Sequence, residues 1–155
     1  MSSSGSKKST SKAPRKNARL FAIQALYQWD ITGTLVNELQ ARARMDNSKK
    51  PTDWPFFDEL LRGTAQHAED LDEMYKSLID RPFDQITPIE KSILRLGCYE
   101  LAHCMETPFQ VVIQEAIILA NIFGAEESFK YINSILDQVA QAVRVHEVKE
   151  TNNDD

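Results

Sequence analysis

The side chains best suited to bind a metal lie close together in the sequence. Cys98, His103 and Cys104 fall within one stretch of seven residues, and the other two histidines are far away. Zinc sites draw four ligands from closely spaced pairs, and a gap of six residues between thiols matches no common zinc pattern. We therefore interpret both cysteines as buried or half-buried thiols of a helix, and we expect neither a metal nor a cofactor.

Motifs of catalysis are missing from the sequence. It contains no Gly-rich phosphate loop, no G-x-S-x-G and no H-E-x-x-H. Carboxylates are abundant, but a run such as 69–73 is typical of a solvated helix face. We expect no enzymatic activity, although the sequence leaves open an active site built from scattered residues.

The basic residues are concentrated at the N-terminus. Residues 1–19 carry a charge of +6 without any acidic residue, from Lys7, Lys8, Lys12, Arg15, Lys16 and Arg19. The other 136 residues carry 12 basic and 23 acidic side chains, so the net charge of −5 hides a basic arm on an acidic body. With Pro14 at the first helical position, these cations would oppose the helix dipole unless an anion such as an RNA phosphate docks there. The alternative is an ordinary solubilising tail.

A second exposed set is predicted near the start of the last helix. Glu127, Lys130, Tyr131 and Ser134 fall on or beside the polar face of that helix. A Tyr next to a Lys can stack a nucleobase and hold its phosphate, as in many complexes with single-stranded RNA. The alternative is a Tyr at the edge of the core.

Helices must position these side chains, because the apolar periodicity is helical almost throughout. It predicts an all-α fold of about six or seven helices in two packed bundles. The first helix follows Pro14 and stops near Gly33, and its one apolar stripe contains Ala18, Phe21, Ala22, Ala25, Leu26 and Trp29. A shorter helix covers 34–45, a loop covers 46–53, and a long helix from 57 to 78 bends near Gly63.

Two matching capping boxes predict the next helix starts. They are Thr87-Pro88-Ile89-Glu90 and Thr107-Pro108-Phe109-Gln110, and they begin helices over 88–105 and 108–123. The helix over 108–123 is apolar nearly all round, which indicates a central, buried helix. The last helix begins near Ala125.

The predicted organisation is one folded domain between two polar tails. Residues 1–12 form a disordered basic tail, 13–145 the domain, and 146–155 a frayed tail. Within the domain, the N-terminal bundle covers about 13–80 and the C-terminal bundle about 86–145. The sequence has neither an apolar run of about 18 residues nor a secretory signal, so we expect a cytoplasmic protein without a membrane partner.

Several short stretches occur in a specific order and spacing. They are Ala18-Arg19, ALYQW at 25–29, EKSILR at 90–95, YEL at 99–101, VIQEAI at 112–117, FGAEES at 123–128, and YIN with ILD within 131–137. Through them, from about Arg15 to Arg144, the chain resembles the NusB family of bacterial transcription antitermination factors.

The resemblance implies a function in RNA binding and no enzymatic activity. It implies that the chain binds NusE, a ribosomal protein, and that the pair binds the single-stranded boxA element of nascent RNA, notably in ribosomal RNA operons. Other Nus factors then join at RNA polymerase, which resists termination. Some relatives dimerise, so a homodimer and a self-associating helical interaction module stay open. NusB-like domains also occur attached to RNA methyltransferases, but this chain has no Gly-rich cofactor loop.

The resemblance and the charge pattern together give a candidate site. The RNA-binding residues are Lys12, Arg15, Lys16, Arg19, Arg95, Glu127, Lys130 and Tyr131. Asn17 stands where relatives often have another Arg, and the upstream lysines would compensate for it. Glu90, Tyr99 and Glu100 are the implied contacts with NusE.

Overall fold

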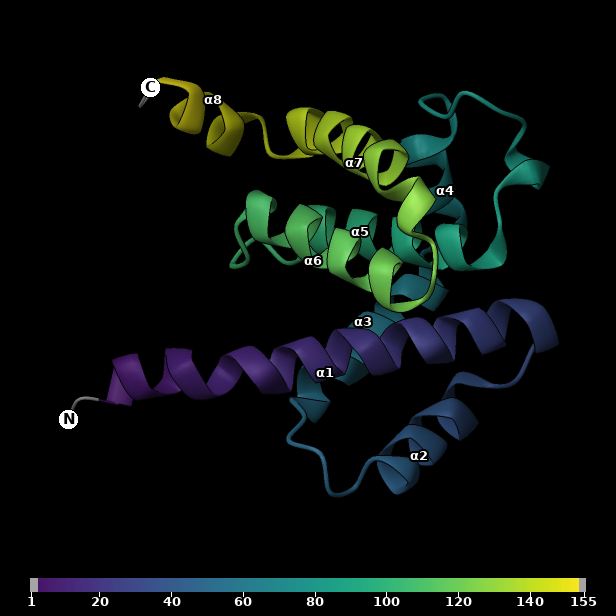
Figure 1. Ribbon diagram of the computed structural model, residues 1–155, viewed down its shortest axis with the longest axis vertical. Coiled ribbons are helices and arrows are strands. Elements are labelled where there is room, and N and C mark those ends of the chain that lie inside the picture. The colour runs from purple at the N-terminus through teal and green to yellow at the C-terminus, as the bar shows by residue number, and fades with distance from the viewer. Residues whose placement is uncertain (1–2, 154–155) are drawn as a thin grey trace. The chain divides into compact units, whose positions relative to one another are not determined.

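The computed structural model describes the backbone of residues 3–153 and the side chains of 12–125 and 127–152. This part of the chain forms eight α-helices and two short 3-10 helices and contains no strand, which confirms the all-α prediction. The helices, labelled in Figure 1, divide into two compact units, one up to Gln66 and one from His67 onward.

Unit 1 contains three helices, α1 (Ser3–Thr32), α2 (Val36–Asp46) and α3 (Trp54–Gln66), and each packs against the other two. The predicted apolar stripe of α1 is buried from Ala18 to Leu26. It packs with buried side chains of α3, which are Phe56, Phe57, Leu60 and Leu61. Gly33 ends α1 with a φ of 71°, a left-handed conformation that suits glycine.

The first helix begins earlier than the sequence predicts. α1 starts at Ser3, so Pro14 lies inside it rather than in its first turn. An interior proline lacks its own N–H donor and its ring crowds the carbonyl four residues earlier. The Pro14 carbonyl accepts a hydrogen bond from the Asp53 N–H at 3.1 Å. Because the helix dipole acts only within the first turn, the predicted dipole-assisted anion site at residues 15–19 is not formed. Disorder of the isolated tail stays a prediction, and residues 1–2 lie outside the described part.

The long helix predicted over 57–78 is two helices. The break is at His67 rather than Gly63, between α3 and α4 (Ala68–Lys76), and α4 belongs to unit 2. A buried ion pair explains this assignment. Asp72 of α4 accepts hydrogen bonds from the Arg95 guanidinium of the next helix, at 2.8 and 2.7 Å. The two units therefore divide at residue 66, not near residue 80.

Unit 2 is built around α5 (Pro88–His103), which contacts α4, α6 (Phe109–Ile122) and α7 (Phe129–Val143). Every residue from Ser92 to Leu101 is buried, whereas Val111 and Ile122 of α6 are exposed. The central helix is thus α5, not the helix predicted over 108–123. Gly97 allows α5 and α7 to approach closely, because a Cβ there would lie 2.8 Å from Leu136 Cδ1.

The connections of unit 2 contain two 3-10 turns, η1 (Phe83–Gln85) and η2 (Glu126–Ser128). The first predicted capping box is confirmed: the Glu90 N–H donates to Thr87 Oγ1 at 3.2 Å, and the Thr87 N–H donates to Glu90 Oε1 at 3.0 Å. α6 begins one residue later than expected, at Phe109. Its first N–H donates at 2.8 Å to the Glu147 carboxylate of α8 (Val145–Asn153).

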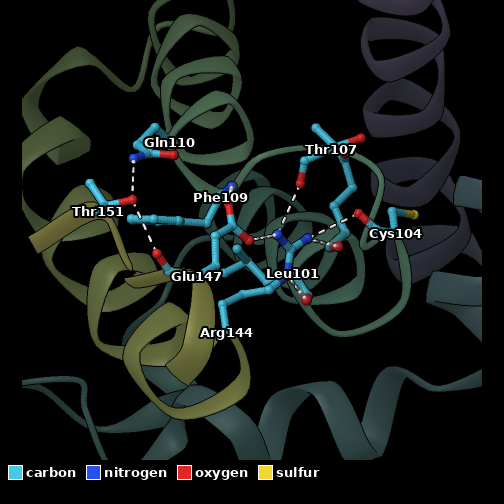
Figure 2. A network of polar contacts seen from close by, with 9 residues as sticks. Leu101, Cys104, Thr107, Phe109, Gln110, Arg144, Glu147 and Thr151 are labelled. Carbon is cyan, nitrogen blue, oxygen red and sulfur yellow. Dashed lines mark hydrogen bonds and ion pairs between the residues drawn. The ribbon is translucent and has the colours of Figure 1, made fainter. Parts of the chain in front are cut away.

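Residues after Arg144 form helix α8 where the sequence predicts a frayed tail. Figure 2 shows the anchor: the buried Arg144 guanidinium points among the carbonyls at the end of α5. It donates to Leu101, Glu100 and Cys104 at 2.7, 3.1 and 2.9 Å, to Thr107 at 2.9 Å, and to the Glu147 carboxylate at 2.6 Å. The Arg144 guanidinium thus donates hydrogen bonds to the carbonyls at the C-terminal end of α5, where the helix dipole is negative, and its bond to Glu147 fixes the first turn of α8.

Candidate nucleic-acid interface

The first candidate surface lies on α1 in unit 1. Lys12 and Lys16 are exposed and, being four residues apart on a helix, lie on the same face. Such a pair of ammonium groups can contact successive phosphates of a nucleic acid without reading its sequence. These two predicted residues are therefore placed where an RNA could reach them.

Arg15 is partly withdrawn from this surface. Its guanidinium carbon lies 3.7 Å from the centre of the Phe56 ring, and Nη1 is 3.8 Å from Asp53 Oδ2. Asp53 also accepts the Phe56 N–H at 3.0 Å, which caps the start of α3. The Arg15 side chain keeps 27% of its surface exposed, so it can still turn an edge toward an anion.

Arg19 is buried, with 4% of its surface exposed. Its guanidinium carbon lies 5.2 Å from the same Phe56 ring. The prediction that Arg19 contacts RNA does not fit this placement, because a buried cation on an aromatic ring stabilises the pairing of α1 with α3. Periodicity gives the physical reason, since Arg19 precedes the buried residues Ala22 and Leu26 by three and seven positions and shares their face of the helix.

The second candidate surface is a pocket of about 400 Å³ in unit 2, here called the Tyr131 pocket. Its lining comes from the segment before α5, from α5, from the α6–α7 connection and from α7. The lining residues are Arg81, Thr87, Ile89, Glu90, Gly124, Ala125, Glu127, Ser128 and Tyr131. The pocket thus collects Glu127 and Tyr131 of the predicted RNA set and Glu90 of the predicted NusE set.

An arginine lies over the tyrosine in this pocket. The Arg81 guanidinium carbon is 4.2 Å from the centre of the Tyr131 ring, a cation–π contact. The Tyr131 hydroxyl is buried and has no hydrogen-bond partner among the described residues. Burial raises the pKa of Tyr131, and the nearby Arg81 opposes that shift. A flat aromatic ring and a planar cation are groups that can stack on a nucleobase.

Glu90 stabilises the wall of the pocket. Its carboxylate completes the capping box of α5 and accepts a hydrogen bond from the Ser128 hydroxyl. Burial opposes the ionisation of Glu90, but the hydrogen bonds from Ser128 and Thr87 outweigh it and hold the pKa of the carboxyl below its usual range. Glu90 therefore ties the start of α5 to the turn before α7.

The other predicted residues of unit 2 lie elsewhere. Arg95 is buried in its ion pair with Asp72, which also accepts the Tyr75 hydroxyl at 3.0 Å, so Arg95 is a core residue rather than an RNA contact. Tyr99 and Glu100 are buried on α5, away from the pocket lining. The Tyr99 ring lies 4.8 Å from that of His103.

Lys130 is exposed next to the pocket but does not line it. Its ammonium lies 6.0 Å from the Phe129 ring on the same turn of α7. Arg81 and Ser128 line the pocket, although neither is a candidate site residue in the sequence. Arg81 lies in a connection between helices, and no motif around it indicates its cation–π contact with Tyr131.

Among the described residues, no three His, Cys, Asp or Glu side chains gather as metal ligands. Within those residues, too, every helix is too short or too polar to cross a bilayer. Burial raises the pKa of the Cys98 thiol, consistent with an unreactive core cysteine.

The fold and these two surfaces define a class: an all-helical protein that presents cationic and aromatic side chains suited to nucleic acid. Comparison with known proteins is more specific. Residues 16–141 match the model of the NusB family. The chain is 41% identical over 136 residues to the transcription antitermination protein NusB of Alcanivorax borkumensis, covering 88% of this chain and 91% of that protein. It is 43% identical to the NusB of Haemophilus ducreyi, covering 84% and 96%.

Solved structures agree with this result. A crystal structure of the antitermination factors NusB and NusE in complex with double-stranded RNA matches with a TM-score of 0.76 at 25% identity, over 84% of this chain and 98% of that one. A structure of T. maritima NusB matches with a TM-score of 0.75 at 25% identity, over 89% and 99%. The chain belongs to the NusB family.

Proposed function

We propose that this chain is a transcription antitermination factor that binds, together with NusE, the boxA element of nascent RNA. The observation that carries the proposal is the similarity over 84% of the chain to a NusB that was solved with NusE and RNA. In this function the protein acts as an adaptor: the RNA complex recruits other Nus factors to RNA polymerase, notably on ribosomal RNA operons.

The cationic face of α1 supplies the phosphate contacts in this proposal. Lys12 and Lys16 are exposed, and Arg15 keeps part of its surface open. Each phosphate neutralised by such a side chain releases counterions from a single strand, which makes the affinity fall with salt by a slope of about 0.7 per contact. Arg19 and Arg95 support the two units from inside.

The Tyr131 pocket supplies discrimination between bases. A base that enters it can stack on the Tyr131 ring, while the Glu127 carboxylate at the rim can accept hydrogen bonds from base edges. Lys130, exposed on the same turn, contacts the phosphate beside that base.

NusE completes the RNA surface in this proposal. Outside residues 1–19 the chain carries a charge of −11, which favours a basic partner such as a ribosomal protein. All three predicted contacts, Glu90, Tyr99 and Glu100, have buried side chains, but Glu90 lines the Tyr131 pocket. We therefore propose that NusE contacts the surface around the N-terminal end of α5, where Glu90 lies, rather than the middle of that helix.

The test is an anisotropy titration of labelled boxA RNA against salt concentration. In the Lys12→Ala, Lys16→Ala double variant we expect weaker binding and a log–log slope smaller in magnitude by about 1.4. The Lys76→Ala, Lys149→Ala variant removes the same charge from exposed sites of unit 2 and is the matched control. If both double variants bind with the slope of the unaltered protein, α1 does not contact the RNA.

A further inference from the structure

We propose that the loop between α2 and α3 is a second phosphate-binding element, in which Lys49 and Lys50 extend the cationic face of α1 along a bound single-stranded RNA. The inference rests on the proposed RNA-binding function and adds two residues to that site. It assigns the loop a role in affinity, not in reading the sequence.

The loop lies along the basic segment of α1. The Lys50 ammonium is 5.7 Å from the Phe21 ring, Asn17 Nδ2 donates to the Pro51 carbonyl at 2.8 Å, and the Asp53 N–H donates to the Pro14 carbonyl at 3.1 Å. The contacts run in opposite order in the two segments, so the loop is antiparallel to the helix. Seven residues of helix rise about 10 Å, which three extended residues also span.

Local hydrogen bonds fix the lysine-bearing part of the loop. The Lys50 N–H donates to the Asn47 carbonyl at 3.0 Å, and the Thr52 hydroxyl donates to the Lys50 carbonyl at 2.9 Å. Asp53 ends the loop as the cap of α3 through the Phe56 N–H. A backbone held in this way loses little entropy when a ligand binds, so its cations are preorganised for phosphate.

The charges of the loop are available to an anion. Lys49 and Lys50 are exposed, and neither forms a salt bridge within the described part of the chain. The acidic residue closest in the loop, Asp53, is already engaged by Arg15 and by the cap of α3.

The position of the loop relates it to the α1 surface. Asn17, which holds the loop, directly follows Lys16 in α1. Because consecutive residues of a helix point about 100° apart, the loop lies beside the face of Lys12 and Lys16, and an RNA backbone that contacts both crosses α1 between Lys16 and Asn17. Arg15 and Arg19 place their guanidinium groups over the Phe56 ring, which leaves less of their charge at the surface. The loop lysines add exposed positive charge close to them. Lysine suits this role, since its ammonium is a mobile point charge that meets phosphate without a fixed geometry.

The experiment measures RNA affinity as a function of salt for Lys49→Ala, Lys50→Ala. The probes are a labelled boxA RNA and a labelled single strand of equal length and unrelated sequence. If each lysine contacts one phosphate, the slope falls in magnitude by about 1.4. Because phosphate contacts carry no sequence information, the ratio of the two affinities stays unchanged. A thermal melt confirms that the variant is folded.

Two further variants separate the loop from general charge. Lys76→Ala, Lys149→Ala makes the same change in net charge and should keep the original slope. Asn17→Ala removes one tether of the loop without changing the charge and should weaken binding by a smaller factor than the double lysine variant. An unchanged slope in Lys49→Ala, Lys50→Ala, or an equal decrease in the control, overturns the inference. Failure of the unaltered protein to bind either RNA overturns the proposed function instead.

Discussion

Replacing Arg144 by Met should destabilise unit 2 strongly, because the buried Arg144 guanidinium donates five hydrogen bonds, which Figure 2 shows. The change keeps an unbranched apolar stem and removes all five hydrogen bonds of the guanidinium. The Glu100 and Cys104 carbonyls keep the N–H groups of Cys104 and Thr107 as partners. The Leu101 and Thr107 carbonyls lose the Arg144 donors.

The expected magnitude follows from these partners. A buried acceptor deprived of its donor costs about 1–3 kcal/mol, and breaking a buried charge pair costs about 3–5 kcal/mol. We therefore expect the free energy of unfolding of unit 2 to fall by about 4 kcal/mol, a large part of the stability of an ordinary domain. Arg144→Lys should recover only part of it, because an ammonium cannot match a planar fork of donors.

Urea denaturation followed by circular dichroism measures this change. Arg42→Met is the matched control, since Arg42 is exposed and pairs only with Glu38 one turn away on α2, an interaction worth about 0.3–0.5 kcal/mol. A loss of less than about 1 kcal/mol in Arg144→Met would refute the reasoning that this residue holds the end of α5 and the start of α8.

Three further predictions concern the candidate surfaces. Tyr131→Ala should weaken binding of boxA RNA by a factor between about 5 and 150, from the loss of one stacked base, and Tyr131→Phe should not, as anisotropy titrations will show. Arg19→Ala should lower the melting temperature, because it removes a buried side chain from the Phe56 ring. Lys16→Ala should weaken RNA binding and leave the melting temperature unchanged. The reverse pattern would contradict the assignment of Arg19 to the core and of Lys16 to the RNA surface. The pKa of Glu90 is lower in the folded protein than in the unfolded chain, so the unfolded chain takes up more protons on acidification. The stability that the Glu90 carboxylate contributes is therefore lost as the pH falls below about 4.5. The stability difference between the unaltered protein and Glu90→Gln should therefore shrink on acidification, measured by urea denaturation from pH 7 to 3.

The sequence predicts the helices of this protein well where local rules decide. The apolar stripe of α1 and the capping box at Thr87 depend on residues within one or two turns, and both are confirmed. Errors arise where distant contacts decide. The pairing of Asp72 with Arg95 assigns α4 to unit 2, and Arg144 orders α8; both involve residues more than 20 positions apart.

The exposure of the candidate site residues depends on packing that the sequence alone does not show. Charge counting located the basic segment of α1, but it could not tell exposed Lys16 from buried Arg19, because both depend on how α1 packs against Phe56. Likewise, Tyr131 was found from its place on a polar face, whereas Arg81 comes from a loop some 50 residues earlier. Packing decides which charges remain at the surface.

The most direct test of the central claim is a titration of labelled boxA RNA with this protein, with and without NusE. We expect that the protein alone binds the RNA in a strongly salt-dependent manner, and that NusE raises both the affinity and the preference for boxA over an unrelated strand of equal length. An affinity and preference that NusE leaves unchanged, or equal binding of boxA and the unrelated strand in its presence, would contradict the proposed function.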